Sequence, residues 1–403
     1  MRLIHTSDWH LGRTLHGENL LPYQDAFLRW LLDEAVRQRA GAVVVAGDIY
    51  DRAVPPLDAV RLLDAALLRF AQAGLPVILI SGNHDSAVRL GFGAGLSEAA
   101  GIHLRTSVAD LARPVLLEDE HGPVAVYGVP YLLPDAVMAD LGVQVRTHEA
   151  VLAEAARLIR ADAAARGAGR TVVAAHAFVT GGQPAESERD IRVGGVADVP
   201  AAVFAGFSYV ALGHLHGAQR AGPPGGPVIR YSGSPLAFSF GEKDHVKSVT
   251  LAEIDAAGQV RTTALPTPVP RPLREVRGTL DGLLARADHH GADQHGADQH
   301  GADSDLADLS GAWVKVVLTD TVRPSAPMER LREKWPHTLI LDFAPEGQLT
   351  SSDADLERLA SATDPVEICG LFVEFTSGGP ADDAHRAVLR AAVESAQHAE
   401  SAA

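Results

Sequence analysis

The sequence predicts an α/β fold: a two-layered mixed β-sandwich flanked by helices, then a small α+β domain and a helical C-terminal tail. Apolar runs of strand length alternate with amphipathic helical segments at the start of the chain, which is typical of a parallel sheet. The sequence that follows is richer in strands, which indicates a second, mixed layer. A proline-rich stretch then separates this core from the rest of the chain.

Three strand–helix units open the chain. The apolar runs at 2–6, 42–46 and 76–80 have the continuous hydrophobic character of buried parallel strands. Two helices connect these strands: one begins near Pro22 and the other spans 57–73. Both are predicted because their apolar residues recur at helical spacing. Binding sites in parallel sheets form beyond the carboxyl ends of the strands. The polar residues just after these strands are Asp8, His10, Asp48, Asn83, His84 and Asp85.

The second layer contributes further histidines. Strands are predicted at 124–129, 171–175, 209–212 and 246–254, with a helix over 149–165. The histidines that follow these strands are His176, His214 and His216.

Two pairs share a spacing that favours convergence. Residues two apart in an extended chain point to the same side, so Asp8 with His10, and His214 with His216, are each expected to meet at one point. A chance Asp and His in a surface turn would explain the first pair alone. It would not explain several polar motifs that nearly all stand at strand ends.

The composition is globular and limits the chemistry. Hydrophobic residues make up 46% of the 403 residues, enough for a large core. The single cysteine, Cys369, excludes an internal disulfide framework and a zinc–thiolate site, and we expect a reducing, cytoplasmic location. The formal net charge of -16 argues against a surface that binds nucleic acid throughout, although a local basic groove or bound metal ions would permit binding.

Proline residues mark the expected domain boundary. We place the core at 1–265, the proline linker at 266–272 and the small domain at 273–345. Residues 289–303 are a His/Asp-rich repeat with almost no apolar content. Such a tract could bind metal. A disordered, repeat-expanded loop is favoured, because nothing apolar would fix the geometry of ligands there.

The tail at 350–403 is predicted to be helical. Asp364 is followed by proline and then, at Glu367, by an acid in the first turn, which is the pattern of a helix start. A later helix in the tail carries one apolar stripe, which either packs on its own domain or binds a partner, and the pattern alone leaves both open. The stripe is formed by Val388, Leu389, Ala392, Val393 and Ala396.

The candidate ligands are carboxylates, one amide and imidazoles. This donor set suits manganese, iron or zinc and disfavours calcium. Seven ligands are too many for one ion and suit two, with one carboxylate shared. Two ions about 3.5–4 Å apart can activate a water and neutralise a phosphoryl group, while a nearby histidine protonates the leaving oxygen. The strand-end residues that offer these ligands and the proton donor are Asp8, His10, Asp48, Asn83, His84, His176, His214 and His216.

Five motifs follow one another along the chain: Asp-x-His at 8–10, Gly-Asp at 47–48, Gly-Asn-His-Asp at 82–85, the lone His176 and Gly-His-x-His at 213–216. In this order they resemble the calcineurin-like metallophosphoesterases. More narrowly, the stretches at 5–12, 46–51 and 231–235 resemble the nuclease subunits of bacterial complexes built with an SbcC-type coiled-coil ATPase, relatives of the meiotic-recombination double-strand-break repair nuclease. The resemblance covers the chain from Met1 to about residue 254.

The resemblance implies roles for these residues. It implies that His84 gives a proton to the leaving group, and Asp85 beside it could orient that imidazole. Archaeal and eukaryotic relatives have a histidine where this chain has Asp51, which puts a substrate-positioning role at this position in doubt. Asp51 could instead cap the following loop. The implied ions, usually manganese, are one held by Asp8, His10 and His216 and one held by Asn83, His176 and His214, with Asp48 bridging.

The resemblance also implies an activity and partners. It implies a Mn-dependent nuclease that digests duplex ends 3'-5' with ATP and cuts single strands and hairpins, in DNA repair, recombination and replication. The domain at 273–345 would be a capping domain that helps to place DNA, and the tail would dock on the ATPase. The implied assembly is a heterotetramer or larger, with a homodimer formed through the nuclease domain and the whole complex associated with the nucleoid.

Two other functions stay open. A small-molecule or phosphoprotein phosphoesterase could use the same dimetal core, and the acidic charge balance favours it. The separate domain and the amphipathic tail count against it, because a small substrate needs neither. A non-catalytic scaffold is disfavoured by the complete ligand set.

Overall fold

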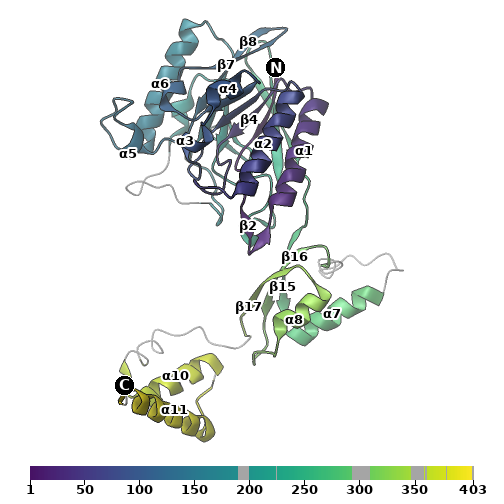
Figure 1. Cartoon of the computed structure of the whole chain (residues 1–403), viewed down its shortest axis with the longest axis vertical. Helices are drawn as coiled ribbons and strands as arrows, with labels where there is room; N and C mark the ends of the chain where they lie inside the picture. Colours follow the sequence, from purple (N-terminus) through teal and green to yellow (C-terminus); the bar gives the residue numbers. More distant parts are fainter. Residues whose placement is uncertain are drawn as a thin grey trace. The chain divides into compact units, whose positions relative to one another are not determined.

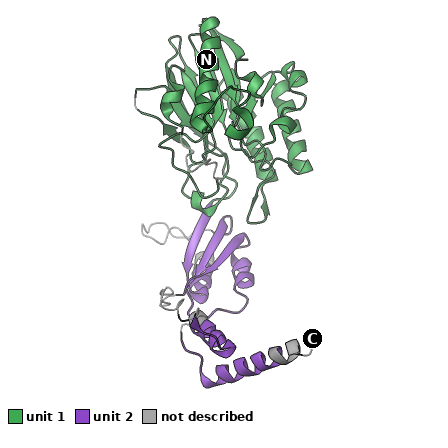
Figure 2. Ribbon diagram, turned by 90° about the vertical axis from the view of Figure 1, so that its left-hand side faces the viewer, with its two compact units in different colours: residues 1–272 green, residues 273–403 purple. Residues whose placement is uncertain are grey.

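The chain folds as two compact units, Met1–Pro272 and Leu273–Ala403, which are coloured separately in Figure 2. This computed structural model describes residues 1–188, 199–223, 225–292, 309–345, 358, 361–377 and 379–401. Figure 1 labels helices and strands of both units.

The first unit contains a six-stranded sheet whose middle is parallel. Its strand order is β14-β13-β1-β4-β5-β6. β1, β4, β5 and β6 run parallel, whereas β13 pairs antiparallel with both β1 and β14. The strands are β1 (Arg2–Thr6), β4 (Ala42–Ala46), β5 (Val77–Ile80), β6 (Ile102–Arg105), β13 (Ser248–Ile254) and β14 (Val260–Pro266).

A second six-stranded sheet has the order β11-β12-β10-β9-β8-β7. β8, β9, β10 and β12 are parallel, and the two edge strands are antiparallel to their neighbours. The strands are β7 (Val115–Asp119), β8 (Gly122–Val129), β9 (Thr171–His176), β10 (Tyr209–Gly213), β11 (Gln219–Ala221) and β12 (Val228–Tyr231). A separate hairpin pairs β2 (Thr14–Leu15) with β3 (Glu18–Asn19).

The two sheets pack face to face. One buried cluster joins Val44 and Ile78 of the first sheet to Val172 and Tyr209 of the second. The outer faces are covered by helices: α1 (Leu21–Arg37) and α2 (Leu57–Gln72) on the first sheet, and α6 (His148–Ala165) on the second. Burial on both faces explains why the strands are continuously apolar. Figure 1 shows α1 and α2 side by side.

The short helices are α3 (Ala87–Leu90), α4 (Ala94–Glu98) and α5 (Pro134–Val137), with 3-10 turns η1 (Val108–Asp110), η2 (Ala201–Phe204) and η3 (Phe240–Glu242).

The second unit begins with a three-stranded parallel sheet of order β15-β16-β17. Val316, Leu283 and Leu331 belong to its buried core, to which both neighbouring helices contribute. Two further helices, α10 and α11, pack against each other. The elements are β15 (Leu273–Gly278), α7 (Leu280–Ala292), β16 (Trp313–Leu318), α8 (Pro327–Lys334), β17 (Thr338–Phe343), α10 (Pro365–Ser377) and α11 (Asp383–Ser401).

The predicted fold class is confirmed: the chain is a mixed α/β protein with sheets flanked by helices. The predicted helix start at Asp364 has a physical basis, because its carboxylate accepts from the Val366 N–H at 3.1 Å. Part of the predicted loop at 289–303 is different, since 289–292 are the end of α7, while 293–303 lie outside the described residues. In the tail, 350–357, 359–360, 378 and 402–403 also lie outside them. Among the helices that the structure describes, none is long and apolar enough to cross a membrane.

Candidate metal centre

The loops after β1 and β4 are held together by main-chain hydrogen bonds. The Asp8 N–H donates to the Gly47 carbonyl at 3.0 Å, and the His10 N–H donates to the Asp48 carbonyl at 3.0 Å. The Leu11 N–H donates to the carbonyl of Ile49 at 2.9 Å. Because these bonds join two neighbouring strand ends, Asp8, His10 and Asp48 are fixed relative to one another before any ligand arrives.

The backbone at these residues is not extended, which corrects the reason given for their convergence. Asp8 has φ 53°, His10 φ 44°, Asp48 φ 49° and His214 φ 108°. β1 ends at Thr6, so the Asp-x-His pair lies beyond the strand in tight turns. Positive φ is unfavourable for residues with a side chain and is concentrated at functional sites. The side chains therefore meet because the turns aim them, and the alternation of a strand plays no part.

Two glycines allow the loops to approach closely. A Cβ on Gly82 would overlap the Asp48 carboxylate, and a Cβ on Gly213 would overlap the Ala46 carbonyl oxygen. The strand ends of both sheets can thus meet only because these positions carry no side chain.

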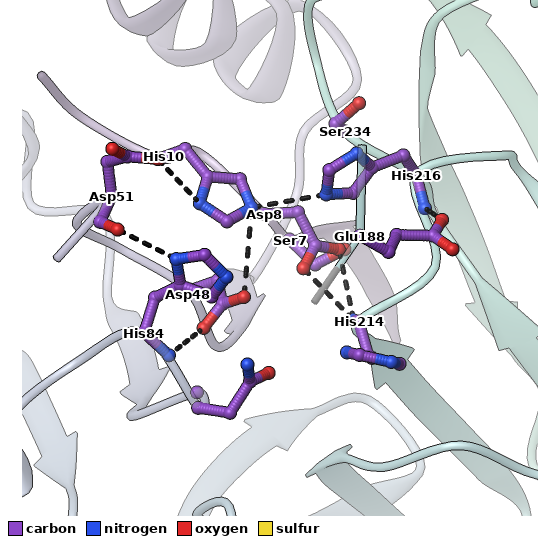
Figure 3. Close-up of polar contacts among 12 residues, drawn as sticks. Ser7, Asp8, His10, Asp48, Asp51, His84, Glu188, His214, His216 and Ser234 are labelled. Atoms are coloured by element: carbon purple, nitrogen blue, oxygen red, sulfur yellow. Dashed lines mark hydrogen bonds and ion pairs between the residues drawn. The ribbon is translucent and has the colours of Figure 1, made fainter. Parts of the chain in front are cut away.

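Three overlapping groups of buried side chains could each hold a metal ion, and Figure 3 labels the members of the two groups that do not include His176. In each group the ligand atoms lie within 4.8 Å of one another. Asp48 belongs to two groups, and its Oδ2 lies 3.7 Å from His10 Nε2 and 3.5 Å from His176 Nε2. It therefore stands between the two halves of the site. The groups are Asp8–His10–His216, His10–Asp48–His84 and Asp8–Asp48–His176.

The histidines are held neutral, as metal ligands must be. Burial lowers the pKa of His176 to about 4 and, likewise, the pKa of His216 to about 4. Burial, together with the neighbouring His216, also holds the pKa of His10 well below its usual range. His176 Nδ1 donates to the Ala46 carbonyl at 2.9 Å, so the neutral ring leaves Nε2 without a proton.

Acceptor atoms face each other in this site, which is the pattern expected where cations bind. The unprotonated His176 Nε2 lies 2.9 Å from Asn83 Oδ1, and neither atom carries a proton for the other. Burial and the nearby Asp48 raise the pKa of Asp8 well above its usual range. Within the described part of the chain, the buried His10 Nδ1 and Asn83 Nδ2 have no hydrogen-bond partner. Divalent cations would relieve this repulsion, and nitrogen and oxygen donors without thiolate fit them.

His84 lies at the edge of the cluster in a defined orientation. Its Nδ1 donates to the Asp51 carbonyl at 2.7 Å, and its backbone N–H donates to Asp48 Oδ1 at 2.9 Å. In the neutral ring the other nitrogen is then free of its proton, and in the charged ring it carries one to donate. The side chain of Asp51 reaches toward the site as well, with Oδ1 3.7 Å from His10 Nδ1.

Asp85 has a different role from the one expected. Its carboxylate accepts from the backbone N–H groups of Ile49 at 3.0 Å, Tyr50 at 2.8 Å and Gly82 at 2.9 Å. It therefore ties the loop after β4 to the loop after β5. The group that orients the His84 imidazole is the Asp51 carbonyl. The pKa of Asp85 is raised to about 7 by burial and by the charge of Asp48.

His214 is placed at the site through its backbone. Its N–H donates to both carboxylate oxygens of Asp8, at 3.0 and 3.2 Å. Its ring lies edge-on to His176, with 5.5 Å between ring centroids. It is not a member of the three groups above, which the described residues form without it. The structure thus brings all seven predicted ligands to one region but groups them unequally.

Sequence analysis missed the residues that support the ligands. Ser7 Oγ donates to Asp8 Oδ2 at 2.5 Å, and Glu188 accepts from the His216 N–H at 2.5 Å. Glu242 and Lys247 form a buried ion pair beside His216. Arg13 stacks on Phe238, with its guanidinium carbon 4.8 Å from the ring centroid. Only Ser7 had a signal in the sequence, since it lies inside the first motif. Arg13 follows that motif without a recognisable pattern, and the others lie far from the ligands in the sequence.

Two family models match the chain. The calcineurin-like phosphoesterase model matches residues 1–218, more than half of the chain. The model described as the type 5 capsule protein repressor C-terminal domain, SbcD_C, matches residues 269–375. Together with the buried His/Asp groups, the first match supports a dimetal centre and a hydrolase of phosphoester bonds.

Solved structures add little. An archaeal phosphodiesterase described as novel is 11% identical, with a TM-score of 0.28, 66% of this chain covered and 100% of that chain covered. A psychrophilic β-glucosidase from Micrococcus antarcticus is 12% identical, with a TM-score of 0.20, covering 78% of this chain and 73% of its own. At these values neither likeness informs the fold or the activity.

The resemblance drawn from the motifs is thus confirmed by two independent regions of the chain, its first 218 residues and the region from 269 to 375. The chain therefore belongs to the calcineurin-like phosphoesterase family, with a C-terminal domain of the SbcD type.

Proposed function

We propose that this protein is a Mn²⁺-dependent DNA nuclease, the nuclease subunit of a complex with an SbcC-type coiled-coil ATPase. It would digest duplex ends 3'-5' with ATP and cut single strands and hairpins, in DNA repair, recombination and replication. The observation that carries the proposal is the position of Asp48, whose Oδ2 lies 3.7 Å from His10 Nε2 and 3.5 Å from His176 Nε2, one ligand of each proposed ion. A shared carboxylate suits two ions held close together.

The residues have separate parts in this chemistry. One ion would be held by Asp8, His10 and His216, the other by Asn83, His176 and His214, with Asp48 between them. Bound there, the two ions supply positive charge to the phosphoryl group and activate the attacking water. His84 binds neither ion in this proposal; it gives a proton to the leaving oxygen, held in place by the Asp51 carbonyl.

DNA is favoured as substrate because of the second unit. The SbcD_C match covers the sheet domain and most of α10, a module that hydrolysis of a small ester does not need. We propose that the domain at 273–345 caps the site and helps to place DNA. A small-molecule or phosphoprotein phosphoesterase is the second candidate, favoured only by the net charge of -16.

Exposed apolar side chains support two protein partners. In the second unit, Phe372 is 61% and Val388 69% exposed, and we propose that α10 and α11 dock on the ATPase. In the first unit, Val88, Phe92 and Leu96 of the α3–α4 region are all more than four-fifths exposed. We propose that this second patch forms a homodimer through the nuclease domain. The complex would act in the cytoplasm, at the nucleoid.

The proposal is tested by hydrolysis assays on the full chain after metal removal. The stripped protein is reloaded with Mn²⁺, Mg²⁺ or Zn²⁺ and given a small phosphodiester, end-labelled duplex, hairpin and single-stranded DNA, and a phosphopeptide. We expect manganese to restore cleavage of the diester and of single-stranded DNA, and the ATPase with ATP to be needed for duplex ends. Hydrolysis of the phosphopeptide without any DNA cleavage would replace this function with the second candidate.

A further inference from the structure

Glu242 is a buried carboxylate that lies beside the ligand groups without belonging to them. It stands at the end of η3 and is 1% exposed. Its Oε1 accepts from the Ser187 hydroxyl and from the Phe238 N–H, the latter at 3.3 Å. Its Oε2 accepts from the Lys247 ammonium. A buried carboxylate with a buried ammonium beside it is charged, and a charged carboxylate can only accept hydrogen bonds.

This fixes the direction of a chain of hydrogen bonds that ends on His216. The Ser187 hydroxyl has one proton, and it gives that proton to Glu242. Ser187 Oγ also lies 2.6 Å from His216 Nδ1, so in that contact the imidazole must be the donor. With the proton on Nδ1, Nε2 of the neutral ring carries a lone pair. That atom lies 3.1 Å from His10 Nε2, inside the first ligand group.

The other oriented histidines of the site reach the same state by a different route. Nδ1 of His176 and Nδ1 of His84 each donate to a backbone carbonyl, of Ala46 and Asp51 respectively. A backbone carbonyl cannot be removed by substitution and always accepts. His216 instead depends on two side chains, so its tautomer is set by residues that can be replaced.

Separate contacts hold the backbone of His216 in place. Its N–H donates to Glu188 Oε1 at 2.5 Å, and its carbonyl accepts from Lys247 Nζ at 3.0 Å. The position of Ser187 is held in turn by Arg13 Nη2, which donates to the Ser187 carbonyl at 2.8 Å. Loss of the Ser187 hydroxyl would therefore leave these main-chain contacts intact. The remaining link between Glu242 and the imidazole would be the long direct contact of Glu242 Oε1 with His216 Nδ1, at 3.5 Å.

We propose that Glu242 and Ser187 are positioning residues that set the tautomer of His216 and keep its Nε2 available to a divalent ion. The inference rests on the proposed function, because it takes the group of Asp8, His10 and His216 to bind an ion. Hydrogen-bond partners of this kind typically affect metal affinity by about 10- to 100-fold when they are removed.

The first test is the affinity of the metal-free full chain for Mn²⁺, measured by calorimetry. The wild-type protein should bind two ions. Ser187→Ala should bind one of them about 10- to 100-fold more weakly and leave the other unchanged, whereas Ser187→Thr, which keeps the hydroxyl, should restore the affinity. Ser239→Ala is the matched control, since Ser239 Oγ contacts the same Glu242 oxygen at 3.5 Å but does not reach His216.

The second test is the tautomer itself, by ¹⁵N NMR of labelled histidines in the metal-free protein, with His216 assigned from the spectrum of His216→Gln. Wild type should show the Nδ1–H form. Glu242→Gln should show a mixture, because an amide can donate to Ser187 and so allow the chain to reverse. The dispersion of the amide signals in the same sample checks that Glu242→Gln is folded.

The outcomes separate the two proposals. Two ions bound with wild-type affinity by a folded Ser187→Ala would overturn the positioning role of Ser187 while the dimetal function stands. An unchanged His216 tautomer in Glu242→Gln would likewise overturn the positioning role of Glu242. A wild-type chain that binds no pair of ions would instead overturn the proposed function.

Discussion

The metal centre and the C-terminal helices differ in how complete each is within this chain. The ligand side chains of the centre are buried, apart from the partly buried Asn83, and hydrogen bonds from within the first unit set their orientations. In α10 and α11, by contrast, Phe372 and Val388 are mostly exposed. Buried polar side chains need partners, so they specify geometry, whereas exposed apolar side chains gain free energy only when something covers them. The difference separates chemistry built into one unit from association that needs another molecule.

Replacement of the shared carboxylate should have the largest effect. Asp48→Ala should lower the affinity for both ions, and activity should fall by more than the roughly 100-fold that loss of an outer hydrogen-bond partner costs. Metal content by mass spectrometry and hydrolysis of a small diester measure this. Asp58→Ala, which breaks only an exposed pair with Arg61, is the control. Retention of two ions by Asp48→Ala would mean that Asp48 does not bridge.

His84→Ala should separate metal binding from proton transfer. We expect both ions to remain and the turnover rate to fall about 10²- to 10⁴-fold, the range associated with general acid catalysis. The turnover rate of this variant should fall much less with a substrate whose leaving group needs no proton. Metal analysis and the comparison of the two substrates provide the measurement. Loss of an ion in this variant would assign His84 as a ligand, which its place in the group with His10 and Asp48 also permits.

Removal of the tail should affect association but not the centre. A chain that ends at Gly347 lacks α10 and α11, while all candidate ligands lie before residue 217. Hydrolysis of a small diester should persist. Binding to the ATPase should weaken by several kcal/mol, since burying a few apolar side chains contributes roughly 25 cal/mol per Å². Co-purification with the ATPase and ATP-dependent duplex digestion are the measurements; their survival would show that the tail is not the docking element.

The pH dependence of the metal affinity should come from carboxyl groups more than from imidazoles. The pKa of Asp8 is raised by burial and by Asp48, so a proton must leave this group when an ion binds. Affinity should therefore rise with pH above 5, where an ordinary Asp, with a pKa of about 3.9, is already ionised. The expected slope is up to about tenfold per pH unit for each proton released.

Protons compete with metal for the histidine ligands only at lower pH. Because the pKa values of His176 and His216 are lowered to about 4, protons compete with metal at these rings only in acid. Calorimetric titrations of the stripped protein with Mn²⁺, in buffers of different ionisation enthalpy, measure the protons released. An affinity that is constant above pH 5 would show that Asp8 is already ionised in the metal-free protein.

The smallest effect is expected from the repeat. Deletion of residues 293–303 should change the free energy of unfolding by less than about 1 kcal/mol, because loop-closure entropy varies slowly with loop length. Denaturant unfolding of the full chain with and without the segment measures this. Loss of folding, or of metal at the centre, would show that the His/Asp tract has a structural or ligand role.

The sequence was sufficient for the strand–helix units because their signals are local. Continuous apolar runs such as Ala42–Ala46 and the helical spacing of Phe27 and Leu31 depend on neighbours a few residues apart. It also identified which polar residues would collect, since parallel strands place their carboxyl ends along one edge. It could not show that Asp85 ties two loops together, because that depends on backbone N–H groups some 36 residues away in the chain.

By itself, then, the sequence determined the fold class, the family and the strand-end residues that meet at the centre, but not the polar residues that support them. Only the tertiary structure decided how these residues are used: that turns with positive φ aim Asp8, His10 and Asp48, and that the Asp51 carbonyl holds His84. It also revealed that Glu242 and Ser187 stand behind His216. The physical reason is that a hydrogen bond requires two groups at a fixed distance and angle. Long-range packing sets that geometry, and residue identity and local spacing do not encode it.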